Sequence, residues 1–200
     1  MVHTRAAIVS LVAVMAARPI AAQWHLGLEL TTTRYRGTSR NRTDSGPTIL
    51  RPADATTISL HGDRTVKHVR IGLRASYANV GLVAGEGKLR LIDKSTGQLF
   101  EVSVLAGFQV VGIGGGSSGA IRAELGPALH LWNLDDELRK RVAALAAVAY
   151  EWPVAKRFTG TIRFEGTISR SWFEESDLPP DFERQVTWRY GVGLGLRYRL

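Results

Sequence analysis

The last part of the chain, from Gln185 to Leu200, alternates strictly between two kinds of side chain. Apolar residues occupy every second position from Val186 onward, and threonine, arginine and glycine lie between them. A period of two is typical of a β-strand with one apolar and one polar face. The stretch is about twice as long as a strand of a globular protein. A tilted strand that crosses a membrane and extends slightly beyond it has this length, so the stretch predicts a membrane-crossing strand.

The beginning of the chain predicts export. Residues 1–5 are basic, residues 6–17 are apolar, and small side chains follow up to Ala22, which is the pattern of a secretory signal peptide. We expect cleavage after Ala22, which leaves a signal peptide of residues 1–22 and a single domain of residues 23–200. The apolar run is too short to span a bilayer as a helix, and no later apolar run approaches the required length.

The composition excludes several kinds of site. The sequence holds no cysteine, which rules out a disulfide framework, a thiolate metal site and a cysteine nucleophile. The formal net charge is +8, but the arginines are spread over strand faces rather than gathered in one patch with aromatic side chains. We therefore expect no nucleic-acid partner. Residues 112–119 are rich in glycine, but no helical pattern follows them, as a nucleotide-binding loop would require.

Eight stretches are predicted as β-strands, at residues 24–34, 56–61, 69–92, 101–110, 121–131, 142–150, 158–172 and 186–200. Residues 37–55 are expected as a loop, with tight turns at 61–65 and 93–97. The alanine-rich stretch 142–150 favours a helix by propensity, and it is assigned as a strand because its neighbours need a partner. Pro127 has no N–H group to donate, so we expect a bulge in its strand.

An even number of strands, with short turns mostly at one end and long loops at the other, is typical of transmembrane β-barrels. The chain resembles the small eight-stranded outer-membrane barrels of the OmpA/OmpX type over nearly all of residues 23–200. The resemblance implies an all-β fold, an eight-stranded antiparallel up-and-down barrel in the outer membrane. It also implies that the barrel-assembly machinery recognises the last strand, although that strand ends in Leu200 where the family most often has phenylalanine.

Alternation alone does not say which face meets lipid, because a soluble lipocalin-type barrel alternates too. The polar face is crowded with small residues, which suits the narrow interior of an eight-stranded barrel. Aromatic residues on the apolar face fall at two levels, as in the interfacial girdles of membrane barrels. We expect this girdle to comprise Trp24, Phe158 and Tyr198 at the end with short turns, and Tyr77, Trp172, Trp188 and Tyr190 at the other.

If the polar face lines the lumen, its charged side chains must be paired, because an isolated buried ion is very unfavourable. Seven charged residues are expected near mid-height as an ion-pair network: Glu29, Arg70, Arg74, Arg122, Glu124, Arg163 and Glu165. Such a network fills the lumen and holds the strand register; a gated pore for small solutes would use the same charges. Arg189, Arg197 and Arg199 are expected nearer the ends, where they are hydrated.

Catalysis is not expected. His130 is placed near the outer rim beside Trp132, Asp135 and Asp136, but no serine or second histidine accompanies it. Asp135, Asp136 and Glu137 lack the spacing of metal ligands, so we expect no metal site and no cofactor.

Outer-membrane lipids are the expected partners. Anionic lipopolysaccharide would form charge-assisted hydrogen bonds with the exposed arginines, which are Arg36, Arg40, Arg42, Arg51 and Arg170. In a second interpretation, the basic first loop pairs with the acidic last loop. The partner of the loops stays open. The sequence predicts a structural or surface-interaction role, with a narrow pore and a lipid-modifying enzyme as alternatives.

Overall fold

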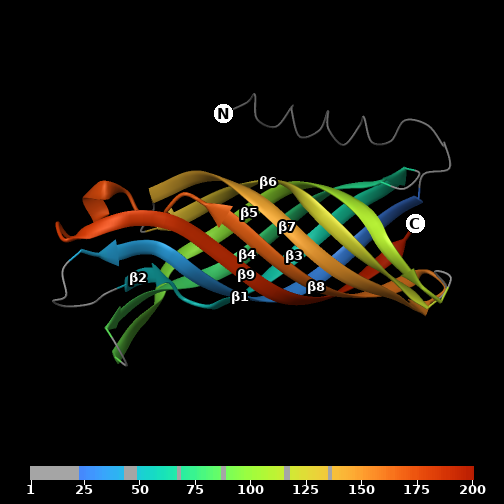
Figure 1. Cartoon of the computed structure of the whole chain (residues 1–200), viewed down its shortest axis with the longest axis horizontal. Coiled ribbons are helices and arrows are strands. Elements are labelled where there is room, and N and C mark those ends of the chain that lie inside the picture. The colour runs from blue at the N-terminus through green and yellow to red at the C-terminus, as the bar shows by residue number, and fades with distance from the viewer. Residues whose placement is uncertain (1–22, 43–48, 67–68, 87–88, 115–117, 135–136) are drawn as a thin grey trace.

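Figure 1 shows a computed structural model of the chain, which describes residues 23–42, 49–66, 69–86, 89–114, 118–134 and 137–200. The expected signal peptide, residues 1–22, and the acidic residues Asp135 and Asp136 lie outside the described residues. Among the described residues, no helix is long and apolar enough to cross a membrane.

The described chain is built almost entirely of β-strands. These are β1 (Gln23–Asn41), β2 (Ile49–Pro52), β3 (Ala55–Val66), β4 (Val69–Glu86), β5 (Leu89–Ile113), β6 (Gly119–Leu134), β7 (Glu137–Ala155), β8 (Phe158–Ser169) and β9 (Phe182–Arg199). A 3-10 turn, η2 (Glu175–Asp177), lies in the connection between β8 and β9.

Eight of these strands close into a ring. Each pairs antiparallel with its neighbours in the order β1, β3, β4, β5, β6, β7, β8, β9, and β9 returns to pair with β1. Closure leaves no free edge in the ring, which is how a sheet satisfies its backbone groups in lipid. The eight-stranded, all-β, up-and-down barrel expected from the sequence is confirmed. The short β2 pairs with β4 beyond the end of β3.

The barrel has two different ends (Figure 1). We call the turn end the one at which β3 connects to β4 and β7 to β8, and at which Leu200 donates its backbone N–H to the carbonyl of Trp24 over 3.0 Å. The opposite loop end carries the long β1–β3 and β8–β9 connections and the outer part of the β4–β5 hairpin, which bends away from the barrel.

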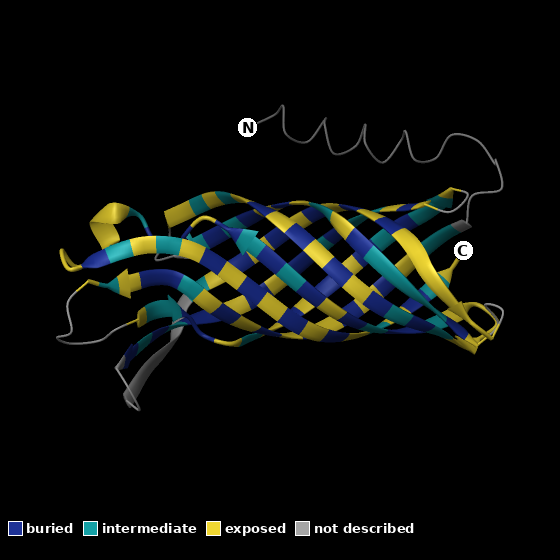
Figure 2. Cartoon of the chain, in the orientation of Figure 1, coloured by how far each residue is buried: buried dark blue, intermediate teal, exposed yellow. Residues whose placement is uncertain are grey.

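Side chains alternate between the inside and the outside along every ring strand, as the chequered burial pattern of Figure 2 shows. Outward leucines such as Leu26, Leu60 and Leu194 expose more than half of their surface, whereas inward glutamates and threonines are buried. Apolar residues outside and polar residues inside are the reverse of a soluble protein, and they suit a barrel surrounded by hydrocarbon.

Small residues face the largest lumen side chains. Gly193 lies opposite Arg163 on β8 and Thr31 on β1, and Ala149 on β7 also faces Arg163. A Cβ atom added to Gly193 would lie 2.5 Å from Thr31 Oγ1 and 3.1 Å from the carboxyl carbon of Glu29. Glycine is therefore needed here because the neighbouring long side chains already fill the space.

Strands extend further than the sequence suggests. β1 and β2 take up much of the expected loop 37–55, the expected turn at 61–65 lies inside β3, and the expected turn at 93–97 lies inside β5. Residues 61–65 pair with β1 on one side and β4 on the other. Two ladders of hydrogen bonds outweigh the turn preference of the Gly62–Asp63 dipeptide in this position.

The alanine-rich stretch 142–150 is confirmed as a strand within β7. Its inward face is apolar, with Leu145 and Ala147 buried, and its outward face is apolar too, with Val142 and Val148 exposed. The period of two is hidden in the sequence because both faces avoid charge. Together with Leu105 and Ala128, the inward residues form one apolar wall of the lumen.

The expected bulge at Pro127 is wrong. The pairs Ser103–Ala128 and Ala106–Leu125 share one register, and only the two pairs between them are absent from the β5–β6 ladder. This local break removes the need for the N–H group that proline lacks. Gly126 lies in the same gap, where a Cβ atom would be 1.8 Å from the carbonyl oxygen of Val104.

Candidate functional site in the barrel lumen

Six arginines and six carboxylates meet in the lumen and form ion pairs with one another. They are Arg70, Arg74, Arg122, Arg163, Arg189 and Arg197 with Glu29, Asp63, Glu101, Glu124, Glu151 and Glu165. We call these twelve residues the lumen network. All seven residues expected from the sequence belong to it, and five more join them.

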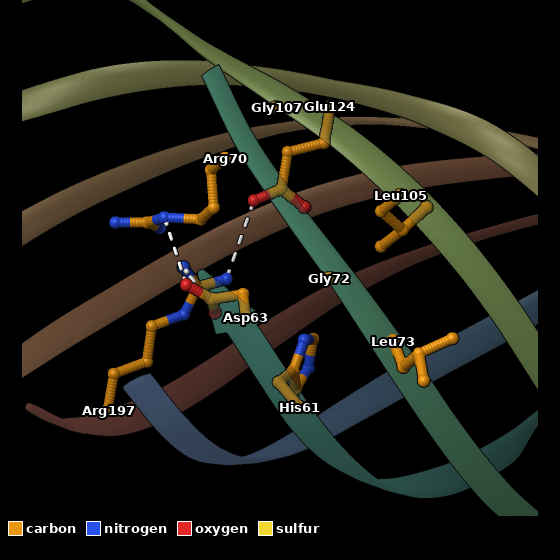
Figure 3. Close-up of a pocket in the computed structure, with 9 residues that line it drawn as sticks. All are labelled: His61, Asp63, Arg70, Gly72, Leu73, Leu105, Gly107, Glu124 and Arg197. Atoms are coloured by element: carbon orange, nitrogen blue, oxygen red, sulfur yellow. Dashed lines mark hydrogen bonds and ion pairs between the residues drawn. The ribbon is translucent and has the colours of Figure 1, made fainter. Parts of the chain in front are cut away.

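The part of the network near the turn end is built around two acids. Glu151 contacts Arg70 at 2.5 Å, Arg122 at 2.7 Å and Arg197 at 2.9 Å. Asp63 lies between Arg70, at 3.1 Å, and Arg197, at 3.5 Å (Figure 3). The free space beside these side chains is about 10 Å³, which is room for about one water molecule.

The part nearer the loop end is built around Arg74 and Arg189. Arg74 contacts Glu165 at 2.8 Å and both Glu29 and Glu101 at 3.4 Å. Arg189 forms ion pairs with Glu101 at 2.5 Å and with Glu165 at 3.7 Å. Arg74 and Glu101 have no exposed side-chain surface, so each charge depends wholly on its partners.

Arg163 connects the two parts. Its guanidinium group contacts Glu124 on the turn side, Glu165 at 3.3 Å and Glu29 at 4.0 Å, and its side chain has no exposed surface. Arg197 completes the connection to the turn-end part, because its Nη2 atom lies 3.4 Å from the same Glu124. The ion pairs therefore form one continuous network along the lumen.

Equal numbers of opposite charges make the network neutral when histidines are uncharged, although the whole chain carries +8. Neutrality matters because buried ions are costly unless each is paired and hydrogen-bonded. Removing one member leaves its partners as uncompensated buried charges, which costs far more than an exposed ion pair contributes.

Three histidines border the network. His130 Nε2 lies 2.9 Å from Glu101 Oε2, His61 Nε2 lies 3.7 Å from Glu29, and His25 Nδ1 lies 3.3 Å from Asp63. The expectation that His130 sits at the outer rim is wrong, because it is buried and turned into the lumen. Within the described part of the chain, no group of three His, Cys, Asp or Glu residues has an arrangement that holds a metal ion.

An aromatic cluster covers the loop end of the network. The ring of Trp132 lies 4.8 Å from that of Trp172 in an edge-to-face contact and 6.1 Å from that of Tyr35, and Phe173 packs against Trp172. We call these four residues the aromatic cap. Trp172 is 1% exposed, so its expected place in the outer girdle is wrong. β8 ends at Ser169, and the chain then turns inward instead of continuing the outward alternation.

The other six residues expected in the girdle lie on the outer surface or at its margin. Tyr77, Trp188 and Tyr190 are exposed toward the loop end, and Phe158 and Tyr198 contact each other at 5.1 Å near the turn end. Trp24, also near the turn end, lies beneath the guanidinium of Arg64 at 5.5 Å. Sequence reasoning missed Tyr150 and Trp152, whose stacked rings join the turn-end group because β7 continues past the expected turn.

Two of the missed network residues share one cause, which is their expected height. Arg189 and Arg197 were placed near hydrated ends but are 3% and 5% exposed. Arg189 lies opposite Tyr35 and Thr167, deep inside the ring, because the strands extend past the level assumed from sequence. Arg199 alone of the three is exposed, as expected. The alternation could have identified Arg189 and Arg197, because it already places both on the inward, polar face of the last strand.

The β8–β9 loop is tied to β7 by two ion pairs. Arg141 contacts Glu174 at 2.5 Å and donates from Nε to the carbonyl of Ser171 over 2.7 Å, while Arg139 contacts Asp177. Arg42 reaches Glu183 at 3.4 Å and donates its backbone N–H to the carbonyl of Asp181 over 2.7 Å. The acidic segment is therefore held both by β7 and by the end of β1.

This loop should loosen in acid. The hydrogen bond from Arg141 lowers the pKa of the Glu174 carboxyl below its ordinary value. A lowered pKa stabilises the docked loop above the ordinary value, and that stabilisation is lost as the pH falls through the lowered pKa. We expect amide-exchange protection in residues 170–181, corrected for intrinsic rates, to fall below about pH 4. Glu174→Gln should show the weaker protection already at neutral pH; equal wild-type protection at pH 3 and pH 7 would contradict this.

Comparison with known proteins identifies the fold. No family model matches the sequence, and no curated protein matches it. Among solved structures, the chain is similar to Neisserial surface protein A, with a TM-score of 0.54 and 8% identity over 90% of this chain and 99% of that one. It is also similar to the outer membrane protein OprG from Pseudomonas aeruginosa, with a TM-score of 0.51 and 12% identity over 88% and 95%. The chain therefore has the fold of the small eight-stranded outer-membrane β-barrels.

Proposed function

We propose that this chain is an outer-membrane barrel with a structural or surface-interaction role, whose lumen is closed and whose loops make the outward contacts. The apolar outer belt, the closed ring and the fold shared with outer-membrane proteins support that location. In this role the barrel is an anchor, and neither transport through it nor catalysis is needed.

The observation that carries the proposal is the continuous lumen network beneath the aromatic cap. Twelve paired charges cross the interior, and free space beside Asp63 is about one water molecule in size. An ion entering this lumen would have to break several buried ion pairs, each of which is costly to open. The network thus serves as a plug, and the aromatic cap is a second barrier at the loop end.

The loop end supports the contact role. The outer part of the β4–β5 hairpin bends away from the barrel, and β2 adds a further short strand beside it (Figure 1). The loop between β8 and β9 is held in place by Arg139 and Arg141. At the other end, the alternating strand β9 supports recognition by the barrel-assembly machinery during insertion.

Absence of catalysis is also part of the proposal. His130, the histidine weighed for catalysis from the sequence, already contacts Glu101 and lies against the ring of Trp132. No serine hydroxyl is hydrogen-bonded to this imidazole among the described residues. Lipid analysis of cells that express the protein tests this point, because a lipid-modifying enzyme would alter acylation or phosphorylation of the membrane lipids.

Conductance in planar bilayers tests the plug. We expect the refolded protein to insert without giving defined single-channel steps, while a general porin in the same bilayer conducts. Regular steps whose size changes in Arg74→Gln would contradict the plug and support the narrow pore instead, because Arg74 lies in the middle of the network.

A further inference from the structure

Near the loop end, three neighbouring strands share one outward arrangement, in which a basic side chain lies above an apolar one. On β7, Lys140 is followed toward the membrane by Val142, and on β9, Arg184 is followed by Val186. Arg170 comes directly after the end of β8. Each strand therefore places a cation at the outer margin and apolar surface immediately below it.

The cations line a surface pocket of about 730 Å³. Its walls include Lys140, Arg141, Arg170 and Arg184, against a single carboxylate among the lining residues, Glu174. Arg141 and Arg184 already contact that carboxylate, at 2.5 Å and 3.7 Å. Lys140 and Arg170 form no ion pair with any described residue, so the pocket keeps an excess of positive charge.

An apolar groove of about 620 Å³ lies on the same three strands and on β6, closer to the membrane centre than the pocket. Its floor is made of small residues, since a Cβ atom added to Gly166 would meet no atom within 4 Å and Ala144 and Ala146 lie beside it on β7. Trp188 and Leu125 form its sides, and each is 54% exposed. A floor of small residues between large apolar walls gives a channel suited to a hydrocarbon chain.

A second apolar groove on the barrel differs from this one in the charge beside it. Another apolar groove, of about 540 Å³, is lined by Leu26, Leu60 and Leu194 with their neighbours, and no charged residue takes part in it. That groove would accept any acyl chain. The groove under Lys140 and Arg170 would favour an acyl chain whose headgroup carries negative charge at the level of the cations.

We propose that the pocket and the groove together form a binding site for a phosphorylated, acylated glycolipid of the outer leaflet, which is the chemistry of lipid A. Phosphate groups lie against Lys140 and Arg170, and an acyl chain fills the groove over Gly166. This inference rests on the proposed outer-membrane role, because it places the loop end in the leaflet that holds such lipids. It goes beyond that role by naming one ligand and one side of the barrel.

Native mass spectrometry of the full chain folded in detergent, titrated with diphosphoryl lipid A, tests the site. We expect Lys140→Gln with Arg170→Gln to weaken binding by about thirtyfold, because each cation near an anionic headgroup contributes a factor of about five. Gly166→Leu, which fills the groove, should weaken binding without changing any charge. The matched control, Lys156→Gln with Arg199→Gln at the turn end, should leave the Kd within about twofold, since it changes the net charge equally.

The outcomes separate the ligand from the fold. Equal affinity for lipid A in the wild type and in both loop-end variants would contradict the proposed site. Binding of phosphatidylglycerol as tight as that of lipid A would contradict the proposal that the ligand is a glycolipid. Heat-modifiable gel migration checks folding in each sample. A wild-type chain without heat-modifiable migration would contradict the outer-membrane barrel itself, whereas a folded barrel without lipid discrimination contradicts only this inference.

Discussion

Replacing Arg163 with methionine should lower the free energy of unfolding by about 3–5 kcal/mol. The Arg163 side chain has no exposed surface and contacts Glu124, Glu165 and Glu29. Methionine keeps much of the apolar packing but leaves these carboxylates short of a cation in a space with little water. Urea unfolding of the protein in vesicles, followed by tryptophan fluorescence, measures the loss.

Two further variants show whether the loss comes from charge. Arg157→Gln removes an exposed arginine at the turn end and should change stability by less than about 1 kcal/mol. Adding Glu124→Gln to Arg163→Met removes one of the stranded carboxylates, so it should recover part of the loss. A loss below about 1 kcal/mol in Arg163→Met would show that the lumen network does not stabilise the barrel.

Periodicity was enough to predict the ring, because a period of two reports directly which face each residue occupies. It also placed Glu29, Arg74 and Arg163 on one inward face, where electrostatics requires them to pair. The strand at 142–150 was predicted from the need of its neighbours for a partner, even though both of its faces are apolar.

Periodicity did not predict where strands end or how high each residue lies. Asp63 is absent from the predicted network because the sequence predicts a turn at that position, whereas it lies within β3. Glu151 is absent because β7 continues past the turn expected after Tyr150. Strand length at a membrane barrel's ends depends on cross-strand hydrogen bonds made by residues far away in sequence. Trp172 was misplaced for the related reason that alternation stops where the strand stops.

Replacing Gly126 with alanine should destabilise the barrel by about 3 kcal/mol or more, because overpacking against backbone leaves few ways to relax. The added Cβ atom would lie 1.8 Å from the carbonyl oxygen of Val104 and 3.2 Å from the Cα atom of Leu105. To relieve this contact, β5 and β6 must move apart at the point where their ladder is already interrupted beside Pro127. Urea unfolding in vesicles, compared at equal protein and lipid concentrations, gives the difference.

Gly166 supplies the matched control. It lies on β8 in the same barrel wall, and a Cβ atom there meets no atom within 4 Å. Gly166→Ala should therefore change stability by less than about 1 kcal/mol, which is the size of the backbone effect alone. Similar losses in Gly126→Ala and Gly166→Ala would show that the close approach to Val104 does not explain the need for glycine.

The orientation of the two faces is the central claim, and nuclear Overhauser contacts between leucine methyl groups and lipid chains in nanodiscs test it most directly. The barrel offers leucines on both faces, so residue type is held constant. Leu60 and Leu194, which are 62% and 63% exposed, should show contacts to acyl-chain protons. Leu105 and Leu145, which are 6% and 2% exposed, should show none. Lipid contacts at the second pair and not at the first would contradict the inward placement of the charged face.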